Sequence, residues 1–107
     1  MTVTAIAPGT IIGGIDTHAD TIHVAAIDPW GRQLGDQEFP TTPTGYSDAL
    51  EFLSSHGQVI GLGIEGTSSY GVGITRAALA ADLTVHEVLR PERAVRRREG
   101  KSDPIDA

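Results

Sequence analysis

The chain has 107 residues and a formal net charge of −6 at pH 7, a size that suits one domain with a modest core. It has no cysteine, which excludes disulfides and thiolate metal sites, and no apolar run nears the roughly 20 residues of a membrane-spanning helix. The first residues lack the basic and apolar segments of a signal peptide, so we expect residues 1–10 to form a flexible tail.

Three strands are predicted in the first part of the chain. The apolar run at 11–16 ends in a carboxylate and is typical of a buried strand. Residues 21–28 are rich in β-branched and small side chains, and the more polar residues 32–39 predict a third strand. Between the last two strands, Pro29 and Gly31 hold the second and fourth positions of a type I turn, which predicts a hairpin.

The following residues predict helices that alternate with strands. Thr44 is placed to cap a first helix, which ends near Gly57. The apolar face of this helix consists of Tyr46, Ala49, Leu50 and Leu53. A strand at 59–65 follows, then a helix at 72–81 and a strand at 83–88. The buried face of the second helix is expected to consist of Ile74, Ala77, Ala78 and Ala81.

Two further helices are predicted at the end of the chain. Pro91 suits the first turn of a basic helix, which Gly100 ends. Ser102 or Asp103 then caps a last helix with Pro104 in its first turn. The predicted order is β-β-β-α-β-α-β-(α), with the final helix cut short, and this order indicates an α/β fold with a mixed sheet and helices on its faces.

Positive charge is concentrated in the last part of the chain. Residues 1–89 hold only Arg32 and Arg76 as strong cations against ten acids, whereas residues 90–107 hold six cations against four acids. Such a run is typical either of a solvated helix face or of a segment that binds nucleic-acid phosphates. We call its cations the basic strip; they are Arg90, Arg93, Arg96, Arg97, Arg98 and Lys101.

Two of the strands predicted to be buried end in an acid, Asp16 and Glu65. If the strands are neighbours, the two carboxylates repel each other and lose solvation, a conflict that a divalent cation relieves. Oxygen ligands select Mg²⁺ or Mn²⁺ over softer metals. Asp103 and Asp106 add two acids on one side of the last helix's first turn. Each acid alone is explained as a turn or capping residue, so the metal-site hypothesis depends on all four.

Three stretches of the sequence together resemble a known family: GGIDTHADTIHVAAID, GLGIEGTSSYG and RPERAVRRREGKSDPIDA. Over residues 12–107 they are similar to the N-terminal domain of the DEDD transposases, the insertion-sequence one-ten family related to the Piv DNA invertases. The resemblance implies a RuvC-like, ribonuclease-H-like fold over residues 11–107. It also implies that the catalytic and metal-binding acids are Asp16, Glu65, Asp103 and Asp106.

The resemblance implies Mg²⁺- or Mn²⁺-dependent phosphodiester chemistry on DNA during transposition. DNA is the implied partner, and a structured bridge RNA guides some family members. A cytoplasmic, nucleoid-associated protein that forms homo-oligomers at full length is also implied. Family members carry a further C-terminal domain with a nucleophilic serine, and the chain ends before one. We therefore expect a truncated domain that is inactive alone.

Two other functions stay open on the sequence. The first is half of an actin-like or sugar-kinase-like ATPase, in which a strand-end Asp also precedes a hairpin. Such an ATPase would bind nucleotide and has no use for the basic strip. The second is a catalytically inert nucleic-acid-binding remnant, which would bind DNA or structured RNA without metal-dependent cleavage.

Overall fold

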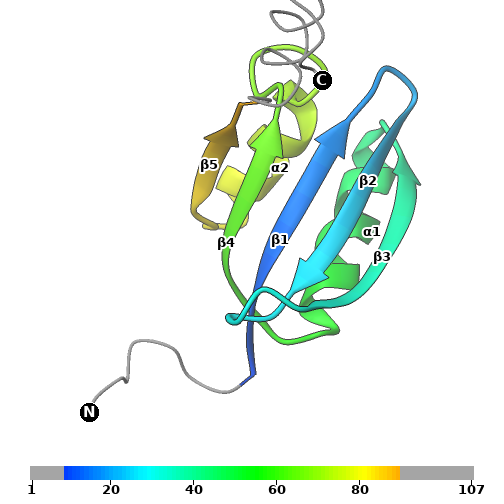
Figure 1. Ribbon diagram of the computed structural model, residues 1–107. Coiled ribbons are helices and arrows are strands. Elements are labelled where there is room, and N and C mark those ends of the chain that lie inside the picture. The colour runs from blue at the N-terminus through cyan, green and yellow to red at the C-terminus, as the bar shows by residue number, and fades with distance from the viewer. Residues whose placement is uncertain (1–8, 90–107) are drawn as a thin grey trace, which may run out of the picture.

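The computed structural model describes residues 9–89, which form five strands and two helices (Figure 1). In chain order these are β1 (Thr10–Thr17), β2 (Thr21–Ile27), β3 (Gln33–Pro40), α1 (Pro43–Ser54), β4 (Gln58–Glu65), α2 (Val72–Ala80) and β5 (Val85–Val88). The predicted α/β class with a mixed sheet is confirmed, and it is compatible with a ribonuclease-H-like fold. The two helices predicted after residue 89 lie outside the described residues.

The five strands form a single mixed sheet in the order β3-β2-β1-β4-β5 (Figure 1). The meander β1-β2-β3 is antiparallel, whereas β4 runs parallel to both of its neighbours, β1 and β5. Parallel neighbours require a crossover connection, and α2 supplies the one between β4 and β5. The strands β1 and β4 therefore lie side by side in the interior of the sheet and end at the same edge.

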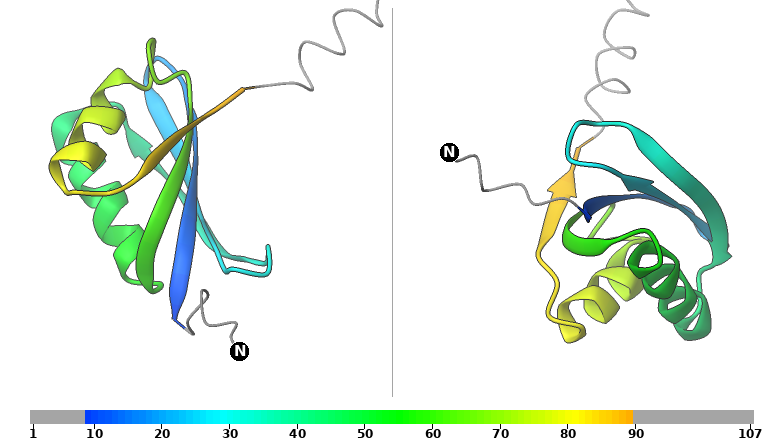
Figure 2. Two further views of the ribbon diagram at one scale, coloured as in Figure 1. Left: turned by 90° about the vertical axis from the view of Figure 1, so that its left-hand side faces the viewer. Right: turned by 90° about the horizontal axis from the view of Figure 1, so that it is seen from below.

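Both helices pack on one face of the sheet, as the two views of Figure 2 show. The core between the helices and the sheet consists of Ile11, Ile15, Ile22, Val24, Ala26, Phe39, Ala49, Leu53, Leu62, Ile64, Ile74 and Ala78. Because strand side chains alternate between faces, the residues directly next to these core positions on each strand point to the other side. No helix among residues 9–89 covers that other side, which we call the open face. None of the helices in this range is long and apolar enough to cross a membrane.

The hairpin turn between β2 and β3 forms where it is predicted. The N–H of Gly31 donates to the carbonyl of Asp28 at 2.9 Å, and Gly31 has a φ of 91°, which favours glycine. The Asp28 carboxylate also accepts hydrogen bonds from the backbone N–H groups of Trp30 and Arg32, at 3.0 and 2.8 Å. The short polar side chain at the first turn position thus stabilises the turn locally.

The N-terminal boundary of α1 differs from the prediction. The helix begins at Pro43, and its cap is Thr42, not Thr44: the Thr42 hydroxyl accepts a hydrogen bond from the Gly45 N–H at 3.0 Å. Proline is favoured at the first helical position because it has no N–H to leave unpaired, so Pro43 determines which threonine becomes the cap. The predicted apolar face is confirmed, with Ala49 and Leu53 buried and Tyr46 and Leu50 partly buried.

The C-terminal boundary of α2 also differs from the prediction. The helix ends at Ala80, and Ala81 is exposed, so its expected place in the buried face is wrong. Asp82 adopts a φ of 66°, which turns the chain out of the helix, and the N–H of Leu83 donates back to the Ala78 carbonyl at 3.0 Å. The helix therefore stops before Ala81 can face the sheet.

The start of β1 lies inside the segment expected to be a tail. Thr10 already belongs to the strand, and the carbonyl of Gly9 accepts a hydrogen bond from the Gln58 N–H at 2.8 Å. A backbone bond to β4 thus holds the first described residue, because a strand inside the sheet has a neighbour to pair with along its whole length.

Candidate functional site

Asp16 and Glu65 stand at the ends of two neighbouring parallel strands. In the register of β1 and β4, Ile15 pairs with Ile64, and the two acids are the next residue on each strand. Adjacent strands lie about 4.8 Å apart. Ile15 and Ile64 are 3% and 0% exposed, so alternation directs both acids to the open face. Sequence and topology together therefore bring these two carboxyl groups to one place.

A shallow cavity on the open face includes both acids in its wall. Gly14 and Gly63 pair with each other two positions before Asp16 and Glu65, and so lie on the same face. Because neither glycine has a side chain, no side-chain atoms from these two positions fill the cavity beside the carboxylates. A Cβ at Gly63 would lie 2.9 Å from a methyl group of Val88, so an added side chain here would have to displace β5 or Val88.

His23 also lines this cavity, opposite Asp16 in the register of β1 and β2. Its Nε2 lies 2.5 Å from a carboxylate oxygen of Asp36 on β3. Among residues 9–89, no group of three or more His, Asp or Glu side chains is arranged to hold a metal ion. The described part of the chain therefore contributes a pair of acids to the site. His23 lies beside this pair because it is the residue paired with Asp16 on β2.

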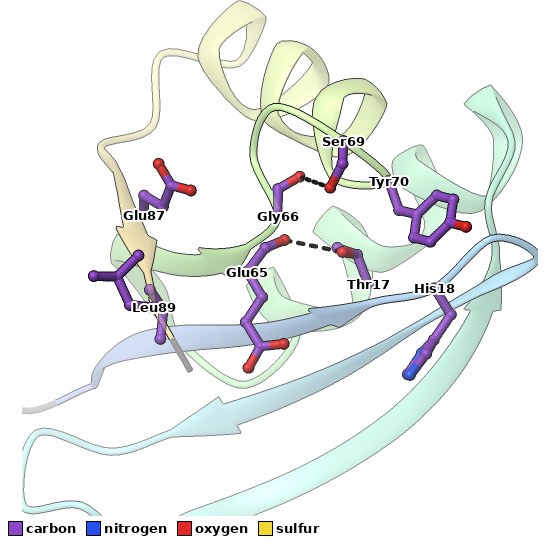
Figure 3. A pocket seen from close by; sticks show the side chains of 9 residues that line it. Thr17, His18, Glu65, Gly66, Ser69, Tyr70, Glu87 and Leu89 are labelled. Carbon is purple, nitrogen blue, oxygen red and sulfur yellow. Dashed lines mark hydrogen bonds between the residues drawn. The ribbon is translucent and has the colours of Figure 1, made fainter. Parts of the chain in front are cut away.

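A second cavity, of about 370 Å³, begins at Glu65 and extends along the loop that follows β4 (Figure 3). The hydroxyl of Thr17 donates to the Glu65 carbonyl at 2.9 Å and so ties the end of β1 to the end of β4. Beyond Glu65, the carbonyl of Gly66 accepts hydrogen bonds from the N–H groups of Ser69 and Gly71, at 2.9 and 2.7 Å. These bonds close the loop into a compact turn beside the acid pair.

Steric contacts require glycine at two positions of this loop, Gly66 and Gly71. Gly66 has a φ of 65°, and a Cβ there would lie 2.9 Å from the Ser69 hydroxyl. A Cβ at Gly71 would lie 2.6 Å from the Gly66 carbonyl oxygen. The glycine spacing in EGTSSYG therefore specifies the turn that follows Glu65.

The other residues predicted for the site are not placed by the structure. Asp103, Asp106 and the basic strip lie outside the described residues, so the four-acid hypothesis stays a prediction. The structure also places His23 in the cavity that Asp16 and Glu65 line, and His18 and Tyr70 in the cavity that Glu65 borders, which the sequence did not predict. Only the alternation of β2 carries a signal for His23, since it places that residue on the open face.

Two acids at neighbouring strand ends supply oxygen ligands of the kind that hold divalent cations in enzymes acting on phosphodiesters. The comparison with protein families agrees with this class: residues 13–107 match the IS110 DEDD transposases, described as transposase. The chain belongs to this family, the insertion-sequence one-ten family that its sequence motifs resemble. A comparison with curated proteins gives no match. Membership assigns the chain a DNA transposase role, with DNA as partner, in a family that generally uses divalent metal ions.

Proposed function

We propose that residues 11–107 supply the RuvC-like N-terminal catalytic domain of a transposase, whose reaction is Mg²⁺-dependent phosphodiester chemistry on DNA. Asp16 and Glu65 are its first two metal-binding catalytic acids, and Asp103 and Asp106 complete the set. The observation that carries the proposal is the strand register, in which the two acids follow the paired residues Ile15 and Ile64.

The donor set fits a hard divalent cation. Both acids are partly buried, both supply oxygen ligands, and both line one cavity. Mg²⁺ in phosphoryl-transfer sites is typically held by one or two carboxylates together with substrate phosphates. When bound, such an ion stabilises negative charge on the phosphodiester and favours formation of the attacking oxygen nucleophile.

The surrounding residues hold the acids in position and leave room for the substrate. Ile15 and Ile64, each adjacent to an acid, are anchored in the core, which limits movement of the two strand ends. Gly14 and Gly63 place no side chains on the open face next to the carboxylates, so a DNA backbone can approach them closely. The chain's own contribution is therefore a rigid, oxygen-lined edge beside an accessible surface.

The proposal extends to partners. The basic strip supplies phosphate contacts, since residues 1–89 hold only two of the chain's eight Lys and Arg residues. A structured guide RNA, assembly into homo-oligomers and a place in the bacterial cytoplasm complete the proposal; they are supported by the family resemblance of the sequence.

The metal site is tested by measuring Mn²⁺ binding to the chain by calorimetry. An amide in place of a ligand carboxylate loses the negative charge and one of the two ligand oxygens, so we expect Asp16→Asn and Glu65→Gln each to lower Mn²⁺ affinity by about tenfold or more. Glu51→Gln is the matched control, because Glu51 is exposed on α1, on the helix-bearing side of the sheet. Folded Asp16→Asn and Glu65→Gln variants with unchanged Mn²⁺ affinity would contradict the proposal.

A further inference from the structure

The cavity behind Glu65 contains two aromatic side chains that the metal-site proposal does not use. Tyr70 projects from the loop after β4 and His18 from the turn after β1, and Figure 3 shows both beside the cavity that Glu65 borders. The Tyr70 side chain is 58% exposed, so its ring is not a core residue. An exposed ring at the edge of a cavity is available to a ligand.

The backbone holds Tyr70 in place. Its two chain neighbours, Ser69 and Gly71, both donate their N–H groups to the carbonyl of Gly66, at 2.9 and 2.7 Å. The Ser69 hydroxyl also contacts that carbonyl at 3.3 Å. Tyr70 therefore projects from a hydrogen-bonded turn shortly after the strand that carries Glu65, so the backbone of the turn needs little ordering when a ligand binds.

The charges around the cavity indicate which part of a nucleotide it accepts. Its described lining includes the carboxylates of Glu65 and Glu87 and no lysine or arginine. Two negative side chains repel a phosphate that lacks a cation, whereas a neutral, flat base can stack on a tyrosine ring. Carboxylates also accept hydrogen bonds from the amino groups of bases.

We propose that this cavity is a base-binding subsite, in which an unpaired nucleobase stacks on Tyr70 while its neighbouring phosphate lies at the Asp16 and Glu65 pair. This inference rests on the proposed function and specifies the substrate as DNA with an unpaired base beside the reacting phosphate. The base must be unpaired because a base inside a duplex is already stacked between its neighbours. His18 supplies a second ring to the same cavity.

The test uses single-stranded oligonucleotides that carry a 5′-fluorescein label and one 2-aminopurine, placed at each position in turn, in Mn²⁺ buffer. Anisotropy of the label reports binding, and quenching of 2-aminopurine reports stacking. We expect quenching at a specific position, loss of that quenching with Tyr70→Ala, and an affinity about 5- to 150-fold weaker, as for the loss of one base–aromatic stack. Tyr70→Phe keeps the ring and should retain both signals.

Trp30→Ala is the matched control. Trp30 is 74% exposed, but it lies in the turn between β2 and β3, at the opposite end of the sheet from Glu65. Its replacement should leave the quenching unchanged. An oligonucleotide with an abasic site at the quenched position should bind the unchanged chain and Tyr70→Ala equally.

The outcomes separate the two proposals. If the oligonucleotide binds but quenching persists in Tyr70→Ala, or disappears in Tyr70→Phe, the stacking site is wrong and the metal-dependent function still stands. If the unchanged chain binds none of the oligonucleotides with Mn²⁺ present, the base-binding subsite is overturned, and Mn²⁺ calorimetry on the same chain decides the metal site separately.

Discussion

At the scale of single residues, Gly45 shows how closely α1 approaches the sheet. It lies in the first turn of α1, and an added Cβ would overlap the carbonyl oxygen of Pro40 at the end of β3. The obstacle is backbone, which cannot rotate away as a side chain can. The absence of a side chain at this position therefore sets the spacing between helix and strand.

We predict that Gly45→Ala destabilises the fold by about 2 kcal/mol or more, the cost of overpacking a tight contact. Alanine improves helix propensity by about 1 kcal/mol, but this gain is too small to offset the clash. The measurement is the free energy of unfolding from urea denaturation followed by circular dichroism.

Gly61→Ala on β4 is the control for this prediction. The nearest atom to its added Cβ is the Thr84 carbonyl oxygen at 4.0 Å, which is ordinary contact. Without a clash, the lower entropy of the unfolded chain should stabilise the protein by about 0.4–1 kcal/mol. Equal unfolding free energies for the two alanine variants would show that the Gly45 contact is not tight.

At the scale of elements, the start of α1 shows where local patterns are ambiguous. Thr42 and Thr44 flank Pro43, and either threonine has a suitable side chain for a cap. Thr42 bonds to the Gly45 N–H at 3.0 Å, whereas Thr44 is exposed within the first turn. The two residues thus form an internal comparison in which only the position differs.

We predict that Thr42→Ala lowers the free energy of unfolding by about 1 kcal/mol, because it leaves a helix N–H without its acceptor. Thr44→Ala should change it by less than about 0.5 kcal/mol, as for a surface substitution that makes no special contact. Urea denaturation of both variants gives the comparison. A larger loss with Thr44→Ala would restore Thr44 as the cap.

At the scale of the whole molecule, the sign of the charge separates two parts of the chain. Residues 1–89 carry ten acids against Arg32 and Arg76, so their field repels DNA except where a cation intervenes. All other lysines and arginines belong to the basic strip. If the chain binds DNA, the electrostatic part of the affinity must therefore come from the strip and from bound metal.

We predict that replacing Arg93, Arg96, Arg97 and Arg98 together by Gln nearly abolishes DNA binding. The slope of log K against log salt should become shallower by about 3, since each lost phosphate contact removes roughly 0.7–0.9. Anisotropy titrations with labelled DNA at several salt concentrations give both quantities.

Arg32→Gln combined with Arg76→Gln is the matched control for charge. Arg32 lies in the turn at the far end of the sheet, where its Nε is 3.7 Å from Oδ2 of Asp28. Arg76 is exposed on α2. The control should leave the salt slope unchanged. A strip variant that keeps the original slope would identify the strip as a solvated face.

Local sequence determined most of the elements of this protein. Alternation and β-branched residues specified the strands, a Pro and a Gly specified the hairpin turn, and helical periodicity specified the apolar face of α1. These signals are readable because they depend on neighbours in the chain. The errors fell at Thr44 and Ala81, where helix ends depend on Pro43 and on the backbone conformation of Asp82.

Only the tertiary structure decided that Asp16 and Glu65 are neighbours. Each acid is recognisable as a strand end, but their meeting requires that β4 insert beside β1, in parallel and in a register that pairs Ile15 with Ile64. The same holds for Tyr70 and His18, whose segments share a cavity only because both follow strands that end at one edge. Sheet order is set by packing between residues far apart in sequence, so no local pattern contains it.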